Sequence, residues 1–293
     1  MNEFMRCHPI VCFSFFAFVI GFSMFFMHPV CLAISLFFAL LYQAMLKGTA
    51  ALFKKLLYIL PAVIFTAALN PLFNHRGMTV LFYLPDKNPM TAESLIYGVS
   101  AAVMLLSVIF WFSAYNAVMT SDKFLCVFGR VIPSLSLVIS MALRFTVRFS
   151  DEIKKVAAAK KCMGQGMKGK SIVKKIRYAL DILSVMASWA LENSVDTADS
   201  MRARGYASAK RTAYSAYRFG RFDLLVLLSV LVPGIYKIFG GVSGKMRFSY
   251  FPTVSFDGPF HISFFLSYAL LCAVPLIIEI TEERKWKALR SKI

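Results

Sequence analysis

The sequence predicts an all-α integral membrane protein with about six transmembrane helices and two long cytoplasmic amphipathic helices. Of its 293 residues, 58% are hydrophobic and only 16% are charged, which is more apolar side chain than a soluble domain buries. Uncharged windows of about 20 residues, the length that crosses a bilayer, alternate with basic segments. The longest basic segment contains two helical patterns that carry too many charges to cross.

Residues 1–121 are predicted to form a membrane domain with about four spans. The run from Cys7 to Leu46 contains no Asp, Glu, Lys or Arg over 40 residues, which is much longer than a signal-peptide core. His28-Pro29 marks a turn that divides this run into two short spans. Leu56 to His75 and Ser94 to Ser121 are the next two uncharged windows.

Residues 222–293 are predicted to form two further spans and a basic tail. The window from Leu224 to Gly244 is interrupted by Lys237, whose long side chain we expect to reach the lipid headgroups. Gly258 to Ile278 is an uncharged window, and the tail from Glu282 to Ile293 has 5 basic and 2 acidic residues.

The distribution of charge predicts the orientation. The formal net charge is +18, and residues 120–221 hold 19 basic and 7 acidic residues, whereas residues 76–93 hold two of each. With both termini in the cytoplasm, every strongly basic segment falls on the cytoplasmic side, as the positive-inside rule requires. The positive charge is therefore explained by topology and by contact with the lipid bilayer, and no nucleic acid partner is expected.

The cytoplasmic region 122–221 is predicted to contain two long amphipathic helices. The first begins near Pro133, which suits a first helical turn, and stops at Gly164 after the helix-terminal cations Lys160 and Lys161. Its leading apolar stretch, "VIPSLSLVISMAL", has 13 uncharged residues and is too short to cross a bilayer.

The second helix is predicted from Ser171, a suitable N-cap residue, to Gly205. Each helix is then about 45 Å long at 1.5 Å per residue. Apolar residues recur on one face at spacings of three and four. This apolar face comprises Ile176, Ala179, Leu183, Met186 and Ala190, with Ile172 preceding it.

The stretch "GQGMKGKS", Gly164 to Ser171, matches the written pattern of an ATP-binding phosphate loop. Such a loop follows a buried apolar strand, but the preceding residues "EIKKVAAAKKCM" are rich in Lys and Ala and favour a helix. We therefore interpret the pattern as a basic hinge between the two helices, and we expect no cofactor.

Other candidate chemical groups give no catalytic or metal site in the sequence. Glu192, Asp196 and Asp199 lie on one helix face without a His or a second acidic cluster, which favours a solvated or salt-bridged surface. The six Cys residues lack C-x-x-C spacing and are expected to pack as small apolar residues. The four His residues are scattered beside the spans.

Both predicted long helices end in similar short motifs, "KKCMGQG" and "RARGYAS". With the stretches "NPLFNHRGMTVLFYL" and "NPMTAESLIYG" in the outer loop, the sequence resembles the transmembrane T component of bacterial energy-coupling factor transporters. In that family two cytoplasmic coupling helices each finish in an Ala-Arg-Gly motif. The resemblance covers most of the chain.

The resemblance implies a non-catalytic scaffold in the bacterial cell membrane. Its partners would be two cytosolic ABC-type ATPase subunits and one membrane S component that binds a vitamin or, less commonly in that family, cobalt or nickel ions. The ATPase-docking residues would be Ala203, Arg204 and Gly205 with Arg202, and Cys162, Met163 and Gly164. The contact face for the S component would be the apolar face of the second helix, Ile176, Ala179, Leu183, Met186 and Ala190. The first motif departs from the family because Met163 replaces Arg, so we expect unequal contacts, with Lys160, Lys161 or an apolar pocket for Met163 compensating.

Three other interpretations stay open at this point. Arg202 and Arg204 are also typical of residues that offset a helix dipole, a role compatible with docking. A membrane-embedded, metal-dependent enzyme acting on a phosphorylated lipid would use Asp196 or Asp199. A self-sufficient carrier is less well supported, because the spans hold almost no ionisable residue besides Lys237.

Overall fold

The computed structural model describes residues 3–74, 76–83, 89–129, 132–164, 171–206, 217–243, 248–256 and 261–290. Contacts divide the chain into two units. Unit 1 comprises Met1–Val127 and Tyr217–Ile293, and unit 2 comprises Phe128–Ala216. Each unit is described separately below.

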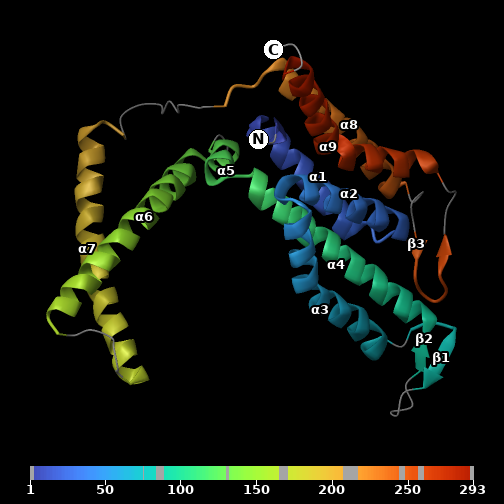
Figure 1. Ribbon diagram of the computed structural model, residues 1–293, viewed down its shortest axis with the longest axis horizontal. Coiled ribbons are helices and arrows are strands. Elements are labelled where there is room, and N and C mark those ends of the chain that lie inside the picture. Colours follow the sequence, from blue (N-terminus) through green and yellow to red (C-terminus); the bar gives the residue numbers. More distant parts are fainter. Residues whose placement is uncertain are drawn as a thin grey trace. The chain divides into compact units, whose positions relative to one another are not determined.

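Unit 1 is built from apolar helices (Figure 1). Among the described residues, five helices are long and apolar enough to cross a membrane, and α1 is a shorter apolar helix. The prediction of an all-α membrane protein with about six spans is confirmed. After a short 3-10 helix, Glu3–Arg6, the helices are α1 (Pro9–Phe25), α2 (Pro29–Lys47), α3 (Thr49–Phe73), α4 (Ala92–Val118), α5 (Ser121–Phe128), α8 (Arg221–Val242) and α9 (Ile262–Arg290).

Side-chain caps start three of the apolar helices. His28 precedes α2, and its Nδ1 accepts from the Val30 amide at 3.2 Å, so the predicted turn at His28-Pro29 is present. His8 caps α1 in the same way, accepting from the backbone two residues on. At α4, Thr91 Oγ1 accepts from the Ser94 amide. These bonds satisfy backbone donors that have no partner inside their helices.

An aromatic cluster around Trp111 joins α1, α2 and α4. The ring centres of Phe15, Phe16 and Tyr42 lie 5.7, 6.4 and 6.3 Å from that of Trp111. Trp111 Nε1 donates to Ser35 Oγ at 3.0 Å. Because lipid is as apolar as these side chains, close packing and such hydrogen bonds hold membrane helices together. Four cysteines are buried, as expected for packing residues: Cys7, Cys12, Cys31 and Cys272.

Two short antiparallel hairpins connect the helices of unit 1. Strands β1 (Val80–Tyr83) and β2 (Pro89–Thr91) pair between α3 and α4, and β3 (Phe248–Ser249) and β4 (Ser255–Phe256) pair between α8 and α9. Glu93 in the first turn of α4 anchors the first hairpin, since its Oε1 accepts from the Thr79 amide at 3.3 Å. Gly77 (φ +145°) lies so close to Glu93 that a Cβ there would overlap the carboxylate.

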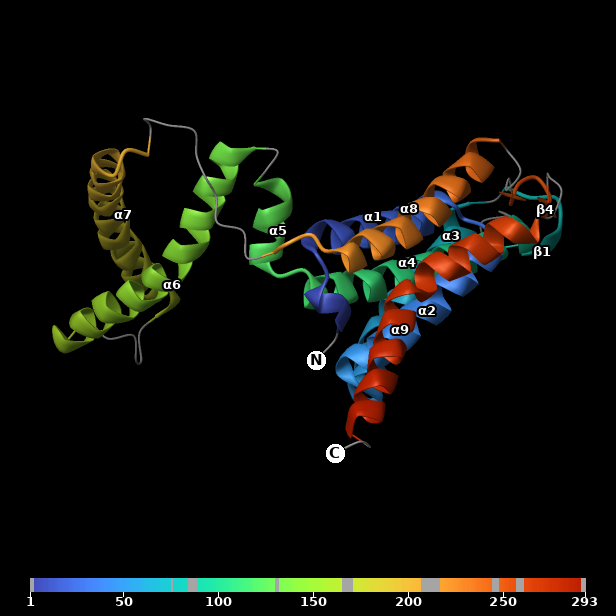
Figure 2. The same cartoon turned by 90° about the horizontal axis from the view of Figure 1, so that it is seen from above.

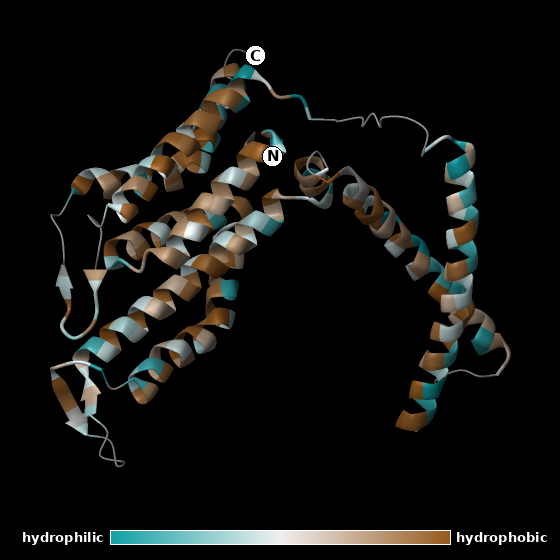
Figure 3. Ribbon diagram, turned by 180° about the vertical axis from the view of Figure 1, so that it is seen from behind, coloured by the Kyte–Doolittle hydropathy of each residue, from teal (hydrophilic) through white to brown (hydrophobic). Residues whose placement is uncertain are grey.

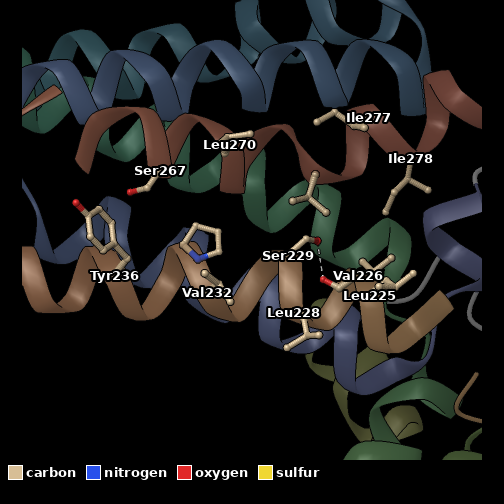
Figure 4. A pocket seen from close by; sticks show the side chains of 12 residues that line it. Leu225, Val226, Leu228, Ser229, Val232, Tyr236, Ser267, Leu270, Ile277 and Ile278 are labelled. Atoms are coloured by element: carbon tan, nitrogen blue, oxygen red, sulfur yellow. Dashed lines mark hydrogen bonds between the residues drawn. The ribbon is translucent and has the colours of Figure 1, made fainter. Parts of the chain in front are cut away.

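Helices α8 and α9 lie side by side and enclose an apolar groove of about 700 Å³ (Figures 2 and 4). Its lining is mostly aliphatic, as at Leu225 and Leu270. The hydroxyls of Ser229 and Ser267 donate to carbonyl oxygens of their own helices at 2.8 and 2.9 Å. No hydroxyl hydrogen of these two serines is left for a ligand, so the groove suits hydrocarbon.

The last helix is longer than the sequence predicts. The apolar window ends at Ile278, whereas α9 continues through the basic tail to Arg290. The tail residues favour helix, and Lys285 Nζ pairs with Glu282 Oε1 one turn earlier at 2.5 Å.

The expectation that Lys237 reaches the headgroups is wrong, because its side chain is 0% exposed inside unit 1. Its Nζ lies 3.1 Å from the ring centre of Tyr268 and 5.3 Å from that of Phe22, and 3.4 Å from Cys31 Sγ. The ring faces and the sulfur replace water around the cation. Burial, with the neighbouring Lys237 charge, also lowers the pKa of His28.

We expect Lys237→Ala to lower the free energy of unfolding by about 2–5 kcal/mol, because it leaves a cavity among packed side chains. Lys237→Met keeps most of the volume and should lose only the contact of the cation with the rings, about 0.5–2 kcal/mol. Equilibrium unfolding of the detergent-solubilised protein measures the free-energy change of each variant. A Lys237→Ala protein as stable as the wild type would contradict this role.

Candidate functional site

Unit 2 contains the two long amphipathic helices that the sequence predicts. They are α6 (Pro133–Cys162) and α7 (Ile172–Ala203). Pro133 is in the first turn of α6, and Ser171 occupies the N-cap position of α7 without a side-chain bond. Hydrophilic and hydrophobic residues alternate along both helices (Figure 3), so each presents an apolar and a charged side.

Helices α6 and α7 cross and contact each other in opposite chain directions (Figure 1). Phe149 of α6 meets Trp189 of α7 edge to face, with ring centres 5.4 Å apart. Nearer the end of α6, Tyr178 Oη donates to the Ala157 carbonyl oxygen at 3.2 Å. An aromatic contact and a hydrogen bond at separate points fix the crossing better than either does alone.

Lys160 adds an ion pair to this crossing. Its Nζ lies 3.1 Å from Asp181 Oδ2 and 5.7 Å from the ring centre of Tyr178, and its side chain is largely buried. Lys160 is therefore bound within unit 2, so it does not offer its charge beside Met163. Lys161, the other cation considered for that role, is exposed.

Both helices end in the same backbone conformation. Gly164 and Gly205 have φ values of 76° and 75°, in the left-handed region that favours glycine. The Gly205 amide donates to the Arg202 carbonyl at 2.9 Å and the Tyr206 amide to the Met201 carbonyl at 3.2 Å. This pair of bonds is a Schellman motif. The Gly164 amide makes the corresponding bond to Lys161 at 3.1 Å.

The side chains around the two glycines are exposed. Met163 is 65% exposed, and Cys162 is exposed beside it. At the other end Ala203 and Arg204 are exposed, and Arg204 has no ion pair within the described part of the chain. Arg202 makes only a long 3.9 Å contact with Asp199. The two ends thus differ at the residue before the glycine, which is the cationic Arg204 in one and the apolar Met163 in the other.

The predicted contact face of α7 is split by the structure. Met186 is buried and Ala190 is half-buried. Both lie on the face of α7 that packs on α6, together with Tyr178 and Trp189. Ile176 and Leu183 are 55% and 64% exposed, and Ala179 is exposed with them. Leu180 also belongs to this exposed apolar stripe, which the sequence pattern alone did not separate from the side that packs on α6.

The phosphate-loop pattern lies mostly outside the described residues, since 165–170 are not described. The segment that precedes Gly164 is the helix α6, whereas a phosphate loop follows a strand. Asp196 and Asp199 are exposed on α7. No group of three or more His, Cys, Asp or Glu side chains is placed to hold a metal ion among the residues that were described.

Comparison with known proteins gives relatives of one description, "Energy-coupling factor transporter transmembrane protein EcfT". The protein from Lactobacillus helveticus is 32% identical over 119 residues, which cover 40% of this chain and 43% of that relative. The one from Macrococcus caseolyticus is 26% identical over 191 residues, 61% of this chain and 71% of the relative. This chain is similar in sequence to EcfT proteins.

The EcfT protein of Bacillus selenitireducens gives a similar match, 27% identical over 190 residues, covering 61% of this chain and 70% of the relative. The match with the Lactobacillus helveticus protein spans less than half of that relative's length. No family model matches the chain. The resemblance to T components that the motifs indicate is confirmed by this similarity to several EcfT proteins.

We expect Gly205→Ala to loosen the end of α7, because a side chain in the left-handed region costs about 1 kcal/mol or more. Hydrogen exchange of the Gly205 and Tyr206 backbone amides in the full chain should become about fivefold faster. Gly205→Asn is the matched control, since Asn tolerates this conformation and should exchange nearly as the wild type does. Unchanged exchange in Gly205→Ala would show that the motif does not hold the helix end.

Proposed function

We propose that this chain is the scaffold and energy-coupling subunit of an energy-coupling factor transporter. It would link two cytosolic ABC-type ATPases to one membrane S component for the uptake of vitamins or other micronutrients. The observation that carries the proposal is the pair of exposed, glycine-capped ends of α6 and α7, found in a chain similar in sequence to EcfT proteins. ATP hydrolysis would occur in the partners, so the chain itself would be non-catalytic.

Arg204 is the proposed anchor for one ATPase. Its guanidinium is exposed and carries no ion pair among the described residues, and Arg forms bidentate bonds with carboxylates. Ala203 and Gly205 beside it are small, which permits close approach of a partner's surface. An acidic side chain in a groove of the ATPase is the expected counterpart.

The end of α6 is proposed to dock differently on the second ATPase. Met163 presents an unbranched apolar side chain between Cys162 and Gly164, and Met adapts well to irregular apolar pockets. Lys160 is held by Asp181, which leaves Lys161 as the nearby exposed cation. The two ATPase contacts are therefore expected to be unequal, one ionic and one mainly apolar.

The crossing of the two helices supports a coupling role. Beyond Asp181, α7 continues for about 30 Å at 1.5 Å per residue, so the two docking ends are separate sites suited to two partners. The crossing contacts would make α6 and α7 move together as one rigid unit. Closure of the two ATPases when they bind ATP would then displace the helix ends at Gly164 and Gly205. The S component would receive that displacement through the exposed stripe of Ile176, Ala179 and Leu183.

The same proposal includes the arrangement in the membrane. The membrane domain would comprise residues 1–121 and 222–293, with residues 122–221 as the coupling region. The distribution of basic residues favours both termini in the cytoplasm of a bacterial cell. Glu192, Asp196 and Asp199 would then form a solvated face, without a catalytic role.

The docking role is tested by replacing Arg204 with Glu, which turns attraction toward an acidic groove into repulsion. We expect affinity-purified wild-type chain to retain ABC-type ATPase subunits, identified by mass spectrometry, and Arg204→Glu to lose at least one of them by about tenfold or more. Transport of the S component's substrate should fall in parallel.

Arg177→Glu is the matched control, because Arg177 is an exposed basic residue near the start of the same helix. It lies about 40 Å from the C-terminal end of α7 at 1.5 Å per residue. It makes the same change of charge and should retain the ATPases. Full retention of both ATPases by the Arg204→Glu variant would contradict the docking role of Arg204. Equal loss of the ATPases in the Arg204→Glu and Arg177→Glu variants would indicate a general effect of charge.

A further inference from the structure

A pocket of about 550 Å³ lies where three helices of unit 1 come together at one end. It is bounded by the last residue of α2, the second turn of α3 and the last turns of α4. Its polar lining is Lys47, Lys55, Ser113 and Asn116, and its apolar lining includes Ile109 and Phe112. Neither the crossing of α6 and α7 nor the glycine ends contribute to it.

The polar lining is rich in hydrogen-bond donors. Lys47 and Lys55 supply two ammonium groups, and neither forms an ion pair within the residues described. Ser113 Oγ accepts from Gln43 Nε2 at 3.3 Å, which leaves the hydroxyl hydrogen of Ser113 for a ligand oxygen. Asn116 adds an amide, and no Asp or Glu lines the pocket. Such a set of groups fits an anion.

Two cations that share a pocket repel each other, and an anion between them removes that cost. The backbone keeps them close, because Gly48 (φ +82°) turns the chain directly from α2 into α3. Lys55 is further held with its Nζ 5.4 Å from the ring centre of Phe110. The pocket is therefore formed by the fold itself, before any ligand arrives.

The position of the pocket along the membrane-spanning helices indicates the source of the anion. It lies at the ends of three membrane-spanning helices, which is the level of the lipid headgroups. The lining combines these polar groups with the apolar side chain of Phe112, which is 47% exposed. A ligand that matches both kinds of lining has a charged head and a hydrocarbon tail.

We propose that this pocket binds an anionic phospholipid, with the phosphate between Lys47 and Lys55 and an acyl chain against Phe112. Two lysines without an acidic neighbour favour a headgroup of net negative charge over a zwitterionic one, whose own cation would be repelled. Charge counting places this turn with the basic segments on the cytoplasmic side. The site is independent of the proposed docking on ATPases.

Native mass spectrometry of the full-length chain in detergent tests this site. Phosphatidylglycerol, phosphatidylcholine and inorganic phosphate are titrated separately, and only phosphatidylglycerol should form a saturable 1:1 adduct. Lys47→Met and Lys55→Met remove the charge and keep an unbranched side chain, so each should weaken that adduct by about tenfold. The corresponding Arg variants keep the charge and should retain it.

Lys54→Met is the matched control, because Lys54 is an exposed lysine of the same turn that does not line the pocket. It should bind phosphatidylglycerol as the wild type does, and unchanged melting temperatures would show that each Met variant is folded. Equal loss in Lys54→Met, undiminished binding by both pocket variants, or equal binding of phosphatidylcholine would overturn the proposal. Displacement of the lipid by inorganic phosphate alone would assign the site to a free anion.

Discussion

The packing of α6 against α7 is the interaction on which the proposed coupling depends. A helix of about 30 residues with charges on one side does not hold a fixed direction in water without a packed partner. Each helix packs on the other at two separate points, the ring contact of Phe149 with Trp189 and the ion pair of Lys160 with Asp181. Because the crossing uses one face of each helix, the ends at Gly164 and Gly205 and the stripe at Leu183 stay exposed.

Unit 1 meets a different constraint, since its helices gain little from burying apolar surface away from lipid. Specific contacts hold them together instead, such as the Trp111 bond to Ser35 and the placement of the Lys237 cation against the Tyr268 ring. Polar side chains such as Ser35 and Lys237 thus serve packing inside the bundle. We propose that Lys47 and Lys55, at one end of the bundle, contact a lipid headgroup instead.

The sequence predicts the apolar spans, the start of α6 at Pro133 and the glycine ends, because these follow from local composition and backbone preferences. It fails where the partner of a side chain lies far away in the chain. The sequence around Lys237 predicts a side chain that reaches the headgroups, because its contacts with Tyr268 and Cys31 cannot be read from the local sequence. Met186 and Ile176 are both apolar residues of the same helical pattern, and the position of α6 determines that Met186 is buried and Ile176 exposed.

The most direct test of the central claim is photo-crosslinking from position 206 in intact cells. A photoreactive amino acid replaces Tyr206, which is exposed beside the motif, so that Arg204 stays in place. The crosslinked partner is identified by mass spectrometry, with position 177 of α7 as the reference. The account predicts an ABC-type ATPase attached at position 206 and none at position 177. Crosslinks from position 206 to lipid or to the chain itself, with no ATPase, would contradict it.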